Sequence, residues 1–130
     1  LAETAANEIG ANSLLVRVGA LYHDIGKMNS PTYLSENQTG SVSPHEEIPP
    51  DQSAKIIVNH VAEGIEMAKK FKLPDRIIDF IRTHHGNSWV YFFYKKAQDI
   101  GDAVDEKDFR YPGPRPFSKE TAILMMADAV

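Results

Sequence analysis

The stretch LLVRVGALYHDIGKM (residues 14–28) decides the fold, because an apolar helical pattern runs directly into two titratable side chains. Its apolar side chains recur at the spacing of one helix face and are Leu14, Leu15, Val18, Leu21, Tyr22 and Ile25. Asn12 is the predicted N-cap and Gly26 the predicted C-terminal stop. The sequence therefore predicts a helix whose last turn carries His23 and Asp24.

The rest of the chain is also dominated by helical periodicity. Helices are predicted over residues 1–9, 51–72, 74–86, 88–101 and 118–130. Ser88 and Ser118 are the predicted N-caps of the last two. Because strand-like alternation is nearly absent, we expect an all-α domain, a bundle of about five to seven helices with two long loops.

The two long connections are residues 29–50 and 102–117. Loops longer than about 12–15 residues in a compact domain are usually functional or disordered. The first loop directly follows His23 and Asp24, which favours a lid or a substrate-contacting segment. Tyr33, Asn37 and His45 are its candidates for nucleobase or phosphate contacts, against an ordinary loop role for each.

Composition limits the classes of function. With 130 residues, 42% hydrophobic and 25% charged, the chain fits one globular domain over residues 1–130. A net charge of −4 argues against a nucleic-acid polymer or an anionic membrane surface as partner. The absence of cysteine excludes disulfides and thiolate-ligated zinc, leaving His and carboxylates as metal ligands.

No apolar run approaches the roughly 18–20 residues of a membrane span. The sequence lacks an initiating Met, opens inside one helix-like run and stops inside another. We therefore expect a piece of a longer protein.

Six titratable residues fall where they could converge from several helices. They are His23, Asp24, His60, His84, His85 and Asp128. Inward-facing polar groups need partners, because an unpaired buried polar group costs about 1–3 kcal/mol and a buried charge more. One shared metal centre would satisfy all of them.

Each member taken singly also has a purely structural interpretation. The His23–Asp24 pair suits a solvated helix end, and His60 suits a hydrogen-bonded surface or core histidine. The His84–His85 doublet suits the C-terminal end of a helix dipole, and Asp128 suits a surface position. The joint order HD, H, HH, D on separate helices is much more specific than any of these parts.

This pattern resembles the HD-domain superfamily of metal-dependent phosphohydrolases. The stretches SENQ…SPH (35–45), HHGNSWVYFFY (84–94) and RYPGP (110–114) are similar to the cytosolic HD domain of the seven-transmembrane HD family. That family is known as membrane-anchored cyclic di-AMP phosphodiesterases, which form linear pApA. The resemblance covers about residues 10–130.

The resemblance implies a ligand set. His23 and Asp24 match its HD ligands, with Asp24 bridging two metals, and Asp128 matches the distal carboxylate of the first site. His60, His84 and His85 match the ligands of the second. The family also uses a histidine upstream of the HD pair, and none precedes His23 here. We therefore expect an incomplete first site.

Imidazole and carboxylate ligands without thiolate suit two divalent transition metals, Fe or Mn before zinc, nickel or cobalt. Two such ions would lower the pKa of a shared hydroxide and stabilise the attacking and leaving oxygens at phosphorus. Asp24 is the predicted bridge, because a carboxylate has two oxygens. Lys27 is the predicted catalytic and substrate-binding cation for a phosphate oxygen, against a role in complementing a helix C-terminus.

The resemblance thus implies a phosphodiesterase acting on a cyclic dinucleotide through a metal-activated hydroxide. Two alternatives stay open: an HD nucleotidase acting on mononucleotides, and a non-catalytic nucleotide-binding signalling domain. Further expectations are a cytoplasmic domain of a bacterial membrane protein, membrane contact only through other parts of that protein, and a homodimer as one option.

Overall fold

The computed structural model describes residues 1–34, 44–101 and 104–130. Within these residues it contains seven α-helices, three short 3-10 helices and one isolated β-bridge. The elements are α1 (Ala2–Glu8), α2 (Ser13–Tyr22), η1 (Ile25–Asn29), α3 (Pro31–Leu34), η2 (Pro44–Glu47), α4 (Pro50–Lys70), α5 (Asp75–Thr83), α6 (Tyr91–Ile100), η3 (Glu106–Phe109) and α7 (Lys119–Asp128). The all-α prediction is confirmed.

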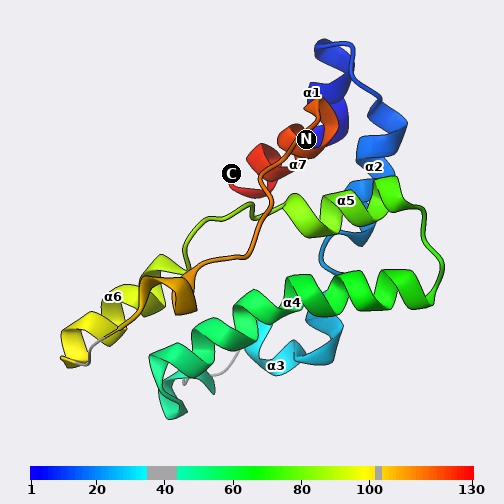
Figure 1. The fold of residues 1–130 in the computed structure, drawn as a ribbon. Helices are drawn as coiled ribbons and strands as arrows, with labels where there is room; N and C mark the ends of the chain where they lie inside the picture. The colour runs from blue at the N-terminus through cyan, green and yellow to red at the C-terminus, as the bar shows by residue number, and fades with distance from the viewer. Residues whose placement is uncertain (35–43, 102–103) are drawn as a thin grey trace.

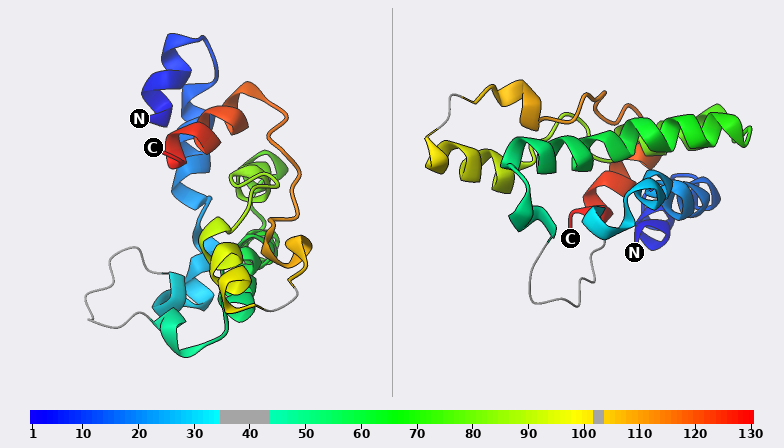
Figure 2. Two further views of the ribbon diagram at one scale, coloured as in Figure 1. Left: turned by 90° about the vertical axis from the view of Figure 1, so that its left-hand side faces the viewer. Right: turned by 90° about the horizontal axis from the view of Figure 1, so that it is seen from below.

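The helices form two groups that meet at α4 and α5 (Figure 1). In the first group α1, α2 and α7 pack on one another, and α2 and α7 also contact α5. In the second, α6 and η3 pack against α4. The two chain ends lie close together at the contact between α1 and α7 (Figures 1 and 2). None of the helices in the described ranges has the length and apolar character needed to cross a membrane.

Three apolar clusters hold these groups together. The first joins α1, α2, α5 and α7 around Phe80, which is 1% exposed. The second joins α4, α6 and η3 around Phe93 and Phe109. The third packs α5 on α4 through Ile78 and Ile81. Because each helix that carries a candidate ligand belongs to at least one cluster, burial of apolar surface fixes the relative positions of those ligands.

The backbones of η1 and α4 approach each other closely at Gly26. A Cβ on Gly26 would lie 1.8 Å from the carbonyl oxygen of His60 and 2.6 Å from the amide nitrogen of Gly64. A side chain at this position would therefore push η1 away from α4. Glycine lets the segment that carries Asp24 and Lys27 pack directly on the helix that carries His60.

The predicted end and inward face of the first long helix are wrong in detail. α2 ends at Tyr22 rather than at Gly26, and the chain continues as η1. Leu14 and Leu21 are 67% and 75% exposed, whereas Val16 and Gly19 are buried. The reason is a close helix–helix contact, because a Cβ on Gly19 would lie 2.4 Å from the ring of Phe80.

The predicted cap of the aromatic helix is also wrong. α6 begins at Tyr91, and the hydroxyl of Ser88 instead donates to the carbonyl of His85 at 2.7 Å. Residues 88–90 are extended because they pair with residues 109–111, through the Trp89–Arg110 bridge. The predicted caps Asn12 and Ser118 are confirmed, each accepting a backbone N–H from its own helix.

The two predicted loops hold short helices where the structure describes them. Residues 29–50 include α3 and η2, and residues 102–117 include η3. The first of these segments lies beside α4 and η1, so it stays next to the His23–Asp24 pair as expected from its position in the sequence.

Candidate metal centre

The structure brings all six predicted ligands together, in two groups that share Asp24. One group is Asp24, His60, His84 and His85, and the other is His23, Asp24 and Asp128. Within each group the potential ligand atoms lie within 4.8 Å of one another. They arrive at the cluster from the ends of α2, α5 and α7, from the junction before η1, and from the middle of α4.

The two carboxylate oxygens of Asp24 face different imidazoles. Oδ1 lies 3.3 Å from Nε2 of His84 and 3.6 Å from Nε2 of His60. Oδ2 lies 3.1 Å from Nε2 of His23, which in turn lies 3.3 Å from Oδ1 of Asp128. Asp24 therefore stands between the two groups, with one oxygen directed to each.

Three of the histidines are oriented by the backbone in the same way. Nδ1 of His23 donates to the carbonyl of Ala20 at 2.6 Å, and Nδ1 of His84 donates to that of Ile81 at 2.8 Å. Nδ1 of His60 donates to the carbonyl of Ile57. A carbonyl oxygen can only accept, so Nδ1 carries a proton in each ring and Nε2 points to the cluster.

This arrangement fits a cation. Nε2 of His60 and Nε2 of His84 lie 3.3 Å apart, and both face Oδ1 of Asp24, a buried atom to which no group in the described ranges donates a hydrogen bond. In the neutral rings these are three lone-pair atoms directed at one another, which is costly unless a proton or a metal ion lies among them. The donor set of imidazoles and carboxylates suits a divalent transition metal.

Three residues of the cluster have shifted pKa values. Burial acts to raise the pKa of Asp24, but the facing imidazoles of His23, His60 and His84 outweigh it and hold that pKa well below its usual range. Burial acts to lower the pKa of His23, but its hydrogen bond to Asp24 and the charges of Asp24 and Asp128 raise it to about 9. Burial, with the charges of His84 and His60, lowers the pKa of His85 to about 3.

A cavity of about 210 Å³ opens beside the cluster. Its lining residues are Lys27, Tyr33, Leu34, Ile57, His60, His85 and Tyr111. Nζ of Lys27 lies 3.2 Å from Oδ2 of Asp24, so the cation predicted from the sequence is at the cluster and at the wall of the cavity. The cavity thus combines ligand histidines, one cation and aromatic side chains.

The residues predicted from the first long loop have different outcomes. Tyr33 lines the cavity. His45 is only 8% exposed, contacts the rings of Tyr33 and Phe93, and pairs through Nε2 with the carbonyl of Tyr33 at 2.6 Å. Its burial favours a role in holding α3 in place. Asn37 lies outside the described residues.

Sequence reasoning missed Tyr111 as a residue of the site. Its ring stacks on His85 and lines the cavity, although it follows His85 by 26 positions. Burial, together with the charges of Asp24 and Asp128, raises the pKa of its hydroxyl. The stretch RYPGP pointed to this segment, but the periodicity of the chain gave no reason to place it against His85.

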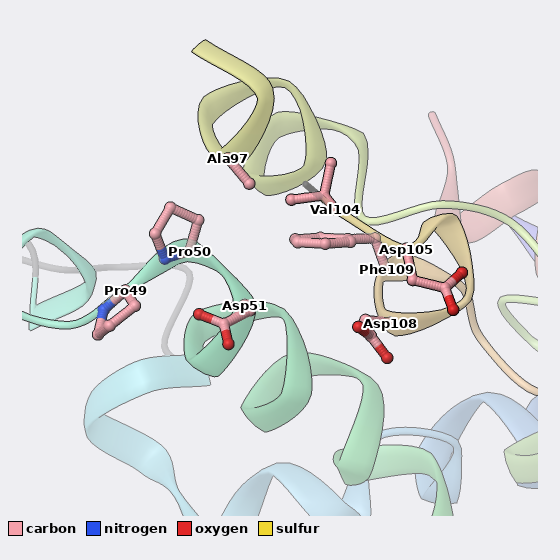
Figure 3. Close-up of a pocket in the computed structure, with 8 residues that line it drawn as sticks. All are labelled: Pro49, Pro50, Asp51, Ala97, Val104, Asp105, Asp108 and Phe109. Carbon is pink, nitrogen blue, oxygen red and sulfur yellow. The ribbon is translucent and has the colours of Figure 1, made fainter. Parts of the chain in front are cut away.

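A larger cavity, of about 350 Å³, lies elsewhere, between the start of α4, α6 and η3 (Figure 3). Three carboxylates, those of Asp51, Asp105 and Asp108, contribute to its lining. Such a lining repels an anionic ligand such as a phosphate. Of these two cavities, the smaller one beside the histidines is better suited to phosphate chemistry.

Comparison with known proteins identifies the family of this chain. The sequence model of the HD domain family matches residues 1–130. The chain is 47% identical over 130 residues to the cyclic-di-AMP phosphodiesterase PgpH of Bacillus subtilis and 48% identical over 130 residues to that of Listeria monocytogenes. All of this chain is covered in both matches, but it spans only 18% of the length of either relative.

A solved structure gives the same result. The HD domain of L. monocytogenes PgpH in complex with cyclic-di-AMP matches with a TM-score of 0.93 and 47% identity, over 98% of this chain and 59% of that one. The fold and the family predicted from the HD, H, HH, D pattern are confirmed, whereas the roles of individual residues stay predictions. The chain belongs to the HD domain family.

Proposed function

We propose that this domain is a metal-dependent phosphodiesterase that hydrolyses a cyclic dinucleotide, cyclic di-AMP, to linear pApA. The observation that carries the proposal is the position of Asp24, whose Oδ1 faces His60 and His84 and whose Oδ2 faces His23. A carboxylate placed in this way can hold two ions side by side, the arrangement used for in-line displacement at phosphorus. The names of the relatives supply the substrate class.

Six residues would hold two divalent metals, for which we propose Fe or Mn. Asp24, His60, His84 and His85 would hold one, and His23, Asp24 and Asp128 the other. The bound ions would supply Lewis acidity to water and to the phosphate oxygens. The chain itself supplies fixed ligand orientation, because three of the imidazoles are held by backbone carbonyls.

Lys27 would bind the substrate and stabilise charge in the transition state. Its ammonium group lies 3.2 Å from Asp24 and lines the cavity, so a phosphate oxygen that enters there meets a cation at the reacting centre. Tyr33 and Tyr111 line the same cavity as Leu34 and Ile57 and would offer contact surface to an adenine ring.

The test uses the full-length protein, because we expect the first metal site to be incomplete within residues 1–130. It is loaded with Fe²⁺ or Mn²⁺ and supplied with cyclic di-AMP or a nucleoside triphosphate in separate reactions. We expect pApA from the first substrate and no turnover of the second. Turnover of the triphosphate alone would assign the domain to the nucleotidases. Two bound metals with cyclic di-AMP left intact would assign it to the binding domains.

The Lys27→Ala variant tests the proposed role of the cation. We expect kcat/KM for cyclic di-AMP to fall on the order of 10²-fold, because one preorganised charge is lost from the transition state. Lys70→Ala is the matched control, since Lys70 is an exposed lysine at the end of α4. Unchanged kcat/KM in Lys27→Ala would contradict the assignment. The domain boundaries, a homodimer and placement in the cytoplasm beside a membrane stay predictions.

A further inference from the structure

His85 differs from the other three histidines of the cluster in what orients its ring. His23, His60 and His84 each donate Nδ1 to the carbonyl three residues earlier in the sequence. In the described part of the chain, His85 has no hydrogen bond from either ring nitrogen to a backbone or side-chain group. A ligand ring without such a bond needs another contact to keep a lone pair directed at a metal.

The contact that His85 does have is a stack with Tyr111. The two ring centroids lie 4.3 Å apart and the ring planes differ by only 13°. By contrast, His85 meets His84 at 47° and His60 at 87°. A near-parallel aromatic stack restricts tilting of the imidazole plane, which is the motion that a hydrogen bond restrains in the other three rings.

Tyr111 is itself held firmly. It is 7% exposed, and its backbone N–H donates to the carbonyl of Ser88 at 2.9 Å. One step further along the same pairing, the N–H of Val90 donates to the carbonyl of Phe109 at 2.6 Å. The guanidinium of Arg110 also lies 4.2 Å from the ring centroid of Trp89. These contacts tie residues 109–111 to residues 88–90, which follow His85 after two positions.

We propose that Tyr111 is the positioning residue for His85 and that its aromatic ring does the work of the missing backbone hydrogen bond. The proposal rests on the proposed function only in treating His85 as a metal ligand. It assigns to the segment around RYPGP a role in assembling the four-ligand group. The aromatic ring of Tyr111 makes the stacking contact, so its phenol hydroxyl is not needed for this role.

The experiment titrates metal-stripped protein with Co²⁺ and follows the visible absorption of the bound ion. Tyr111→Leu removes the ring, Tyr111→Phe keeps it without the hydroxyl, and Phe109→Leu is the matched control. Phe109 is a buried aromatic residue of the same segment, 1% exposed, that packs against Ala54, Phe93 and Ala97 rather than against a ligand.

We expect Tyr111→Leu to weaken the tighter Co²⁺ site by about 10–100-fold, the range found when orienting partners of metal ligands are removed. Tyr111→Phe and Phe109→Leu should bind Co²⁺ as the wild type does. Equal loss in Tyr111→Phe, equal loss in Phe109→Leu, or no loss in Tyr111→Leu would each overturn the proposal. If Tyr111→Leu does not fold, Tyr111→Met supplies a flexible, unbranched side chain without a ring, and the same comparisons apply.

A second measurement does not depend on metal or on phosphodiesterase activity. In the metal-free protein, the carbon-bound ring protons of His85 should be shifted upfield in NMR spectra by the stacked ring. We expect this shift in the wild type and in Tyr111→Phe, and its loss in Tyr111→Leu or Tyr111→Met. Persistence of the shift without the ring would overturn the proposal. If the upfield shift depends on the ring at position 111 but no metal binds, the proposed function is wrong, whereas the stacking of Tyr111 on His85 is still supported.

Discussion

The two halves of the cluster hold candidate metal ligands in different surroundings. The half formed by His60, His84 and His85 is built on α4 and the end of α5, and His60 and His84 are each 1% exposed. The half formed by His23 and Asp128 lies between the ends of α2 and α7, and Asp128 is exposed. Asp24 serves both. We call these the buried half and the exposed half.

The two halves differ in how their charged and polar atoms are balanced by neighbouring protein groups. In the exposed half, His23 stands between two carboxylates and has a pKa of about 9, so it is protonated at neutral pH and offsets part of their charge. The buried half places imidazole nitrogens against each other and against a carboxylate oxygen that has no hydrogen-bond donor among the residues that the structure describes. The buried half is therefore preorganised for a cation, whereas the exposed half must first give up a proton.

The largest effect is expected where the two halves meet. Asp24→Ala removes the carboxylate that both share, so we expect loss of both metals and a fall in phosphodiesterase activity of about 10³-fold or more. Metal content and pApA formation measure the two effects. Asp79→Ala is the matched control, because Asp79 is a partly buried aspartate on α5 that pairs with Arg82 instead. Wild-type turnover in Asp24→Ala would break the assignment of the shared residue.

The second prediction concerns the backbone contact between η1 and α4 that keeps Asp24 beside His60. Gly26→Ala places a methyl group where the carbonyl of His60 already lies, so η1 must move away from α4. We expect a loss of about 1–3 kcal/mol in the free energy of unfolding and a loss of metal from the buried half, because Asp24 moves away from His60. Chemical denaturation and metal analysis report these changes.

Gly10→Ala is the control for that substitution. Gly10 has a φ of +73°, but a Cβ there would meet no atom within 4 Å. It should therefore lose stability through backbone strain alone and keep its metal content. If both variants lost metal equally, the contact between η1 and α4 would not be what keeps Asp24 beside His60.

The third prediction uses pH to tell the halves apart. A metal that binds the exposed half must displace the proton on His23, whose pKa is about 9. Apparent affinity there should rise about tenfold per pH unit until the pH reaches that value, and then level off. In the buried half, His85 has a pKa of about 3 and is already neutral, so it adds no such dependence between pH 5 and 9.

Co²⁺ titrations at several pH values, with release of protons followed by an indicator, measure this difference. We expect one site whose apparent affinity keeps rising up to about pH 9 and whose occupation releases the proton of His23. His23→Gln should remove the steep dependence, because no proton is then displaced from the imidazole. The same steep dependence in His23→Gln would show that the exposed half does not differ from the buried half in the way described.

The sequence predicted the architecture well because local rules control most of it. Helical periodicity located the helices, and the side chains of Asn12 and Ser118 cap α2 and α7 as expected. The order of the His and Asp residues along those helices identified the members of the cluster. These features depend on neighbours within a few positions along the chain, which is the range over which a single sequence is informative.

What the sequence missed depends on contacts between distant segments. The inward face of α2 is set by the approach of Gly19 to Phe80, about sixty positions away, so Leu14 and Leu21 are exposed instead. Tyr111 reaches His85 only because residues 109–111 return to pair with residues 88–90. The candidate His45 contacts the rings of Phe93 and Tyr33, which the sequence did not indicate, and its role stays a prediction. A pattern in one chain does not encode such pairings directly.

The smallest effect is expected from the cap of the helix that carries Asp128. Ser118 and Thr121 form a capping box at the start of α7, so Ser118→Ala should lower the free energy of unfolding by about 1 kcal/mol. Because α7 supplies a ligand only to the exposed half, the variant should weaken metal binding there slightly and leave the buried half unchanged. Denaturant unfolding and Co²⁺ titration test both statements. Asn12→Ala, which uncaps α2 instead, should lower the free energy of unfolding by a similar amount. Equal weakening of both metal sites in either variant would show that the two halves do not respond separately to the packing of their helices.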